Sequence, residues 1–244
     1  MESVPWLPWV LAAGAFVAAL SIYPYTATAI AYRGSDNGLA YILLVMGVGV
    51  WNAMFAAQLL DSDALVKGFF LSLSIVGASL AGLGWFLFAG TASSTTTVPR
   101  RRLTYGVASV LVGANIFLVI TSPTHELYWR PLSETSATAA FAAVDPQYLY
   151  WIHTLFLVGL FGAGTLLFFD AWRAGISPRY ARAYTLAGSA TVLAVVGSNV
   201  AIPGGVSVAP LTAASLTTIG WIQANHGHPL TKYRPSVPFD RLSK

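Results

Sequence analysis

The chain has 244 residues, of which 56% are hydrophobic and 9% carry a charge, whereas soluble domains carry roughly 25% charged residues. This composition excludes an ordinary soluble domain and indicates a protein that crosses the membrane several times. The chain has no cysteine, which excludes disulfides, thiolate catalysis and thiolate metal sites.

Seven apolar stretches are each long enough to cross a bilayer as a helix, which takes roughly 20 mostly apolar residues. The predicted fold class is therefore all-α, a polytopic membrane protein built as a seven-transmembrane helix bundle. We expect residues 1–224 to form this membrane domain and residues 225–244 to form a cytoplasmic polar tail. In chain order, the stretches occupy residues 8–32, 39–60, 67–90, 103–121, 147–170, 180–202 and 205–224.

The distribution of basic residues predicts the orientation of the bundle. Eleven of the thirteen Lys and Arg residues fall on one side of the spans, and only Lys67 and Arg130 fall on the other. Because basic residues are retained in the cytoplasm, we expect a multi-pass protein of the cell membrane with its N-terminus outside and its C-terminus inside. The net charge of +4 then follows from topology, so the expected partner is the lipid bilayer and not nucleic acid.

Two classes of membrane protein are excluded by the residues inside the spans. A retinal photoreceptor needs a lysine in its seventh helix, and residues 206–225 contain none. A proton pump or ion-coupled carrier normally places a carboxylate near the middle of the membrane, and no Asp or Glu is predicted there. His153 is the only ionisable residue predicted to lie well inside a span.

The third span carries small residues that predict close packing against another helix. They are Gly77, Ala78, Gly82 and Gly84. Small side chains allow helix backbones to approach one another in lipid, and we expect packing to be their role.

Neutral polar and aromatic side chains gather at similar depths in the outer half of the spans, counted at about 1.5 Å per residue. A mostly apolar cavity with a few polar groups is the usual form of a small-molecule site. The alternative is that these groups only hydrogen-bond between helices, worth roughly 0.6–2 kcal/mol each. We also expect one helical turn to stack His125 on Trp129. The predicted outward-facing pocket has as its candidate ligand-binding residues Trp51, Asn52, Gln58, Asn115, His125, Trp129, His153 and Asn199.

No catalytic residue, metal site or cofactor is predicted. His125, Glu126 and His153 are residue types found in zinc sites, but their spacing is not a metal-binding motif. A haem held by two histidines would need both to face each other inside the bundle, and only His153 is well placed for that.

Short motifs occur along the chain in the order expected of a known sensor family. They are Arg33 after the first span, Trp51 in the second, GWFLFAG at 84–90, PRRRL at 99–103, TSPTHELYW at 121–129, Tyr150, Trp151 and His153 in the fifth span, and Asn199 in the sixth. The stretch at 121–129 is the most specific of them. Over residues 8–224, the chain resembles the seven-helix N-terminal sensor region of membrane histidine kinases.

This resemblance implies perception of a signal in the membrane and its relay to a cytoplasmic kinase or transducer. The predicted function is a membrane-embedded sensor that binds a small lipophilic molecule, external or membrane-borne, in the outward-facing pocket. By analogy with signalling kinases, a homodimer is also expected. The alternatives are a small-molecule carrier or channel and a cofactor-binding membrane protein.

The chain departs from the kinase pattern after residue 224. The segment that follows is too short for a phosphate-accepting helix and an ATP-binding domain, so we expect no enzymatic activity. The chain is then either the sensor module of a longer protein or a receptor that signals through a partner. Signalling requires that the ligand bind one arrangement of the bundle better than another, and a coupling of roughly 1–3 kcal/mol is enough.

Overall fold

The computed structural model describes residues 6–31, 33–34, 37–61, 63–93, 101–131, 144–201 and 207–226. The predicted polar tail lies outside the described residues except for positions 225 and 226. The basic residues at 100, 232, 234, 241 and 244, which support the predicted orientation, lie outside them as well.

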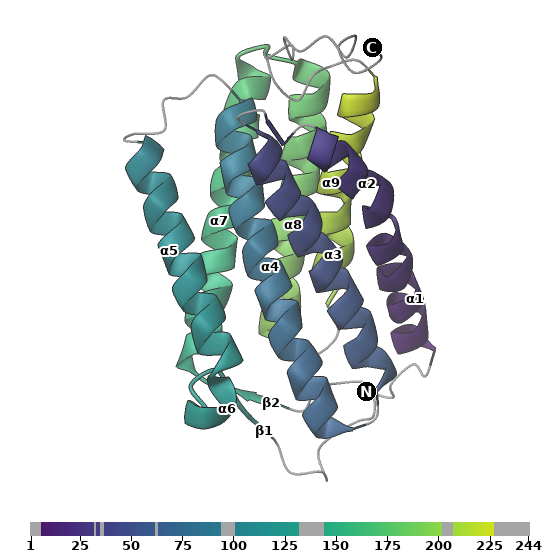
Figure 1. Ribbon diagram of the computed structural model, residues 1–244, viewed down its shortest axis with the longest axis vertical. Coiled ribbons are helices and arrows are strands. Elements are labelled where there is room, and N and C mark those ends of the chain that lie inside the picture. The colour runs from purple at the N-terminus through teal and green to yellow at the C-terminus, as the bar shows by residue number, and fades with distance from the viewer. Residues whose placement is uncertain are drawn as a thin grey trace, which may run out of the picture.

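Long helices that run side by side make up most of the described chain (Figure 1). Within the described residues, and with α1 and α2 taken as one span, six segments of 19 to 28 residues are long and apolar enough to cross a membrane. The all-α fold of a polytopic membrane protein is thereby confirmed. The helices are α1 (Leu7–Leu20), α2 (Ile22–Ala31), α3 (Gly38–Leu60), α4 (Ala64–Ala92), α5 (Arg101–Ile120), α6 (Ser122–His125), α7 (Tyr148–Arg173), α8 (Pro178–Ala201) and α9 (Ala209–Asn225).

Helix α9 occupies the place of the predicted seventh span. It has 17 residues and covers about 25 Å. It begins four residues later than predicted, because Ser207 and Val208 are not helical and Pro210 stands in its first turn, where the missing N–H of a proline does no harm.

The first span is interrupted, which was not predicted. Helix α1 ends at Leu20 and α2 begins at Ile22. Pro24 has no N–H to donate to the carbonyl of Leu20 and its ring crowds that turn, so the helix breaks there. The Ser21 hydroxyl instead donates to the carbonyl of Ala18 at 2.7 Å.

A short β-hairpin closes one end of the bundle. Strands β1 (Trp129–Pro131) and β2 (Val144–Pro146) pair antiparallel, with Trp129 opposite Pro146. Figure 1 places this hairpin and α6 together at the end where α3 terminates, and the last turn of α9 at the opposite end. We call these the hairpin end and the tail end; the predicted orientation puts the hairpin end outside the cell.

Helices α3 and α4 touch through their backbones. A Cβ atom added to Gly77 would lie 2.4 Å from the Trp51 nitrogen, and one added to Gly84 would lie 2.2 Å from the Leu44 nitrogen. Such distances leave no room for any side chain. The predicted packing role of these two glycines is confirmed, while Gly82 packs against side chains of α7.

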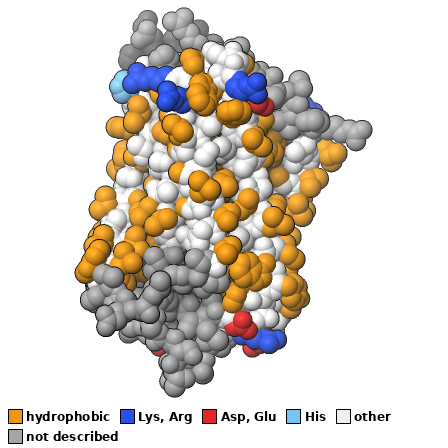
Figure 2. All heavy atoms as spheres, turned by 180° about the vertical axis from the view of Figure 1, so that it is seen from behind, with side chains coloured by type: hydrophobic (Ala, Val, Ile, Leu, Met, Phe, Trp, Pro, Cys, Tyr) orange, Lys and Arg blue, Asp and Glu red, His pale blue; other side chains and the backbone are white. Residues whose placement is uncertain are grey.

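Charged side chains lie at the two ends of the molecule and apolar ones cover the band between them (Figure 2). Large exposed apolar residues continue along α1 and α5, among them Phe16, Leu20, Val110 and Phe117. An apolar belt of this kind suits contact with lipid tails.

The absence of cysteine allows a direct test of orientation. In single-cysteine variants, Glu126→Cys at the hairpin end should react with a membrane-impermeant thiol reagent on intact cells. His226→Cys at the tail end should react only after permeabilisation, because the basic end is predicted to be cytoplasmic. The parent chain provides the blank. The reverse pattern of labelling would refute the orientation.

Replacing Gly77 should weaken the α3–α4 contact. We expect Gly77→Ala to lower the free energy of unfolding in mixed micelles by about 1–3 kcal/mol, because the methyl group collides with backbone. Gly113→Ala on α5 is the matched control, since nothing lies within 4 Å of its added Cβ. Equal effects of both substitutions would contradict the packing role.

Candidate functional site

A cavity of about 50 Å³ lies between α3, α4, α7 and α8 in the half of the bundle nearest the hairpin end. Gln58 near the end of α3, Tyr150 in the first turn of α7 and Asn199 near the end of α8 lie at the side of the cavity nearest the hairpin end, and Trp51 lies further from that end. A buried water needs at least about 10–15 Å³, so the space holds a few waters or one small group. Its walls are formed by Trp51, Phe55, Gln58, Leu71, Ser74, Ile75, Ala78, Tyr150, His153, Leu157, Ser198, Asn199 and Ser207.

The wall of this cavity mixes apolar side chains with neutral polar ones. Among the described residues that line it, none is an Asp, Glu, Lys or Arg. On α4, Leu71, Ser74, Ile75 and Ala78 follow one another at helical spacing, so one face of that helix supplies a whole wall. A mostly apolar surface with a few polar groups suits an uncharged small molecule.

His153 is the most unusual group in this wall. Its side chain is 3% exposed, and its Nδ1 atom has no hydrogen-bond partner among the described residues. The neighbouring Thr154 accepts a hydrogen bond from the Asn199 amide at 3.1 Å, which ties α7 to α8. A buried polar atom without a partner is unfavourable, so a hydrogen bond to Nδ1 from a guest molecule or from water would stabilise this site.

Of the eight candidate residues, the structure brings four together at the cavity: Trp51, Gln58, His153 and Asn199. The other four are not part of its wall and have contacts of their own. Asn52 donates from Nδ2 to the carbonyls of Val48 and Pro210, both at 2.9 Å. It therefore links α3 to the beginning of α9.

Asn115 connects α5 to two other parts of the structure. Its Nδ2 donates to the Ser79 hydroxyl of α4 at 2.9 Å, and its Oδ1 accepts from the Tyr128 hydroxyl beside the hairpin. Tyr128 is 1% exposed, and burial raises the pKa of its phenol well above the usual range. The phenol thus stays protonated and donates to Asn115.

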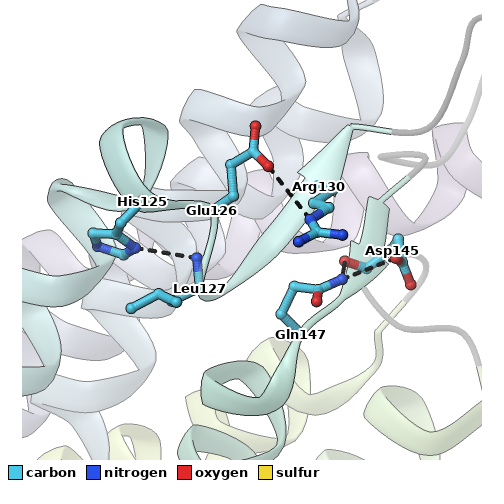
Figure 3. Close-up of polar contacts among 6 residues, drawn as sticks. All are labelled: His125, Glu126, Leu127, Arg130, Asp145 and Gln147. Atoms are coloured by element: carbon cyan, nitrogen blue, oxygen red, sulfur yellow. Dashed lines mark hydrogen bonds and ion pairs between the residues drawn. The ribbon is translucent and has the colours of Figure 1, made fainter.

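The predicted stacking of His125 on Trp129 within one helical turn is wrong. Helix α6 ends at His125, Glu126 adopts a left-handed conformation with φ 50°, and Trp129 already belongs to β1. The imidazole closes this turn locally (Figure 3): its Nδ1 accepts from the Leu127 N–H at 3.1 Å, and its Nε2 lies 3.3 Å from the Thr121 hydroxyl.

Polar contacts in the hairpin hold it over the end of the bundle (Figure 3). Arg130 Nε lies 3.4 Å from Glu126 Oε2, and Gln147 Nε2 donates to Asp145 Oδ2 at 2.8 Å. The Gln147 N–H also donates to the Tyr128 carbonyl at 2.9 Å. His125 and Trp129 are therefore part of a structural cover, and among the described residues no group of three His, Asp or Glu could hold a metal ion.

Comparison with known families agrees with this architecture. A family described as the N-terminal 7TM region of histidine kinase matches residues 9–224. The chain belongs to this family. No curated protein and no solved structure gives a significant match. The chain is thus a multi-pass membrane sensor region of the histidine-kinase type, with a sensor role in signalling to a cytoplasmic kinase or transducer. The matched region is a sensor region and includes no kinase catalytic domain.

Sequence reasoning missed several wall residues of this sensor region, among them Phe55, Ser74 and Ser207. The sequence contains a pattern that points to Ser74. This residue lies one helical turn from Leu71 and Ala78, on the side of α4 that also carries Gly77 and Gly84. No such pattern points to Ser207, since it precedes α9 and its place depends on the turn before that helix.

The Asn115 contacts predict a stability effect that leaves the cavity wall intact. Asn115→Ala should lower the free energy of unfolding by about 1–2 kcal/mol, because the Tyr128 hydroxyl loses its acceptor in a buried place. Adding Tyr128→Phe to the Asn115→Ala variant should lower the free energy of unfolding only slightly further, because the two substitutions remove the same hydrogen bond. Asn225→Ala at the exposed end of α9 is the control. Additive losses from the first two substitutions would contradict the pairing.

Proposed function

We propose that this sensor region perceives a small external or membrane-borne molecule in the cavity between α3, α4, α7 and α8 and relays it through α9. The observation that supports this proposal is a wall whose described residues include no Asp, Glu, Lys or Arg and in which Nδ1 of His153 has no hydrogen-bond partner among the described residues. A bound molecule that forms a hydrogen bond with Nδ1 would bind most tightly to the arrangement of the helices in which it can reach this atom, and would thereby favour that arrangement.

Helix α3 offers a direct route from the cavity to α9. Trp51 lines the cavity, and its neighbour Asn52 donates to the carbonyl of Pro210 at the beginning of α9. Nearer the tail end, the Tyr41 hydroxyl donates to the Thr217 carbonyl at 2.9 Å. The Tyr41 ring fills the space beside Gly220, where an added Cβ would come within 2.5 Å of it.

Two further tyrosines hold the last turns of α9. The Tyr25 hydroxyl of α2 lies 3.1 Å from the Thr218 hydroxyl, and the Tyr184 hydroxyl of α8 donates to Gln223 Oε1 at 3.0 Å. Each hydrogen bond of this kind contributes roughly 0.5–1.5 kcal/mol. Exchanging one or two of them therefore supplies the roughly 1–3 kcal/mol that coupling needs.

A buried aromatic cluster favours a sensor over a carrier or channel. The ring of Trp51, which lines the cavity, lies 6.2 Å from the Phe161 ring, and the cluster continues through Trp85 and Phe168 to Tyr184. Trp85 is tied to α7 by a hydrogen bond from Nε1 to the Phe161 carbonyl at 3.0 Å. A carrier needs a continuous polar path, and this cluster blocks the way from the cavity toward the tail end.

Filling the cavity tests the relay without knowledge of the natural ligand. Spin labels at Arg179→Cys on α8 and Asn225→Cys on α9 report the distance between the tail ends of both helices. In this background Ser198→Phe, which places a ring in the cavity, should shift the distance distribution measured by pulsed electron paramagnetic resonance. Ser189→Phe on the exposed side of the same helix should not.

Ser198→Leu serves as a second, smaller filler if the phenylalanine variant does not fold. A distance distribution unchanged by a folded filler would refute the relay to α9. Pairing of two copies belongs to the same proposal, by analogy with signalling kinases. A protein labelled only at Asn225→Cys would report it as a distance between two chains.

A further inference from the structure

We infer that the cavity recognises the hydroxyl group of an uncharged amphiphile, an inference that rests on the function proposed above. The charge of the cavity wall favours a neutral guest molecule. Among the described residues of the wall, only Tyr150 and His153 have ionisable side chains. Bringing an ion into such a place without a counter-charge is strongly unfavourable, so a neutral guest is favoured over a carboxylate or an amine.

The nearest basic side chain on a wall helix does not change this argument. Lys67 lies one helical turn from Leu71 toward the hairpin end, is buried, and interacts electrostatically with Asp61. Its charge therefore has a counter-charge outside the cavity wall, and none of the residues that line the cavity supplies another.

The hydrogen-bonding capacity of His153 favours a hydroxyl group on the guest molecule. In a neutral imidazole, Nδ1 is a donor in one tautomer and an acceptor in the other. A hydroxyl group can match either, because it both donates and accepts. Ser74 and Ser198 add hydroxyls to the same wall. A guest hydroxyl can therefore satisfy His153 whichever tautomer it adopts, which a carbonyl group cannot do.

The apolar part of the wall suits an alkyl chain on the guest molecule. Phe55, Leu71, Ile75 and Leu157 face the same space as the polar groups, so a short alkyl chain attached to the hydroxyl finds apolar partners. Each methylene buried there should strengthen binding about four-fold. With a volume of about 50 Å³, the cavity takes the hydroxyl and only the first carbons of such a chain.

Two sources can present this chemistry: a free alcohol and the hydroxyl headgroup of a neutral membrane lipid. The chain has four histidines, so the side-chain signals of isotope-labelled histidine form a simple nuclear magnetic resonance spectrum. His153→Phe identifies the signal of His153 by its loss. Titration with n-butanol in phosphatidylcholine nanodiscs tests the first source, and nanodiscs that contain dioleoylglycerol without butanol test the second.

We expect butanol or dioleoylglycerol to shift the His153 signal at saturating levels. n-Propanol should bind about four-fold more tightly than ethanol, and n-butanol should gain less than this over n-propanol, because the cavity takes only the first carbons of the chain. Butyrate and butylammonium, matched in length but charged, should bind at least about ten-fold more weakly. Ser198→Phe should abolish the shift, and Ser189→Phe should preserve it. Thermal stabilisation by butanol should fall in His153→Phe, because the hydroxyl loses its partner.

Two results would overturn the inference. One is binding of butyrate or butylammonium as tight as that of butanol. The other is a His153 signal that neither source moves, which means that the cavity takes up water only. The spin-label distances test the sensor role separately. If a cavity-filling substitution moves α9 while no alcohol binds, the proposed sensor function stands and the proposed ligand class is refuted. If alcohol binds and the cavity-filling substitution does not move α9, the ligand class stands and the proposed relay through α9 is refuted.

Discussion

The hydrocarbon core of a bilayer offers polar groups no water, so each polar side chain between helices needs a partner inside the protein. The bundle meets this demand by crossing hydrogen bonds from helix to helix: Trp85 to the Phe161 carbonyl, Tyr41 to the Thr217 carbonyl and Asn115 to Ser79. The interior is thereby held in one arrangement. Among the described residues, the buried Oδ1 of Asn52 and Nδ1 of His153 have no hydrogen-bond partner. Of these two residues, His153 lines the cavity, so a bound molecule would matter most there.

The contact between α3 and α4 determines how such a guest could act at a distance. Because the two backbones touch at Gly77 and Gly84, neither helix slides along the other without losing that contact. Both contribute walls to the cavity, and α3 also holds α9 through Asn52 and Tyr41. The pair thus contacts both the cavity and α9. Under the proposed function, displacement of this pair would link binding to output.

Much of the fold followed from the sequence, because hydrophobic length is a strong signal in membrane proteins. The bounds of α3, α4, α5, α7 and α8 lie within a few residues of the predicted spans. Two local effects of proline were not predicted: the break in the first span before Pro24, and the late start of α9, which has Pro210 in its first turn. The β-hairpin was not predicted either, because its strands, Trp129–Pro131 and Val144–Pro146, are too short to show the alternating pattern of a strand.

The site was predicted only in part, and the reason is geometric. Counting residues gives the depth of a side chain in the membrane but not the direction in which it points. Asn115 and Gln58 lie at similar depths, yet α5 packs at the edge of the bundle and its amide meets Ser79 of α4. His125 and Trp129 were assigned to one helix, whereas the left-handed Glu126 ends that helix after a single turn. Both outcomes depend on neighbours that a single sequence does not reveal.

The short length of α9 has a consequence for the surrounding lipid. A helix of 17 residues covers about 25 Å, less than the roughly 30 Å of a typical hydrocarbon core. The bilayer must thin beside α9, or residues at its ends must reach toward the headgroups, and each ångström of mismatch carries a modest elastic energy. Membrane thickness therefore acts on the helix that is proposed to carry the signal, and thin and thick bilayers should favour different tilts of it.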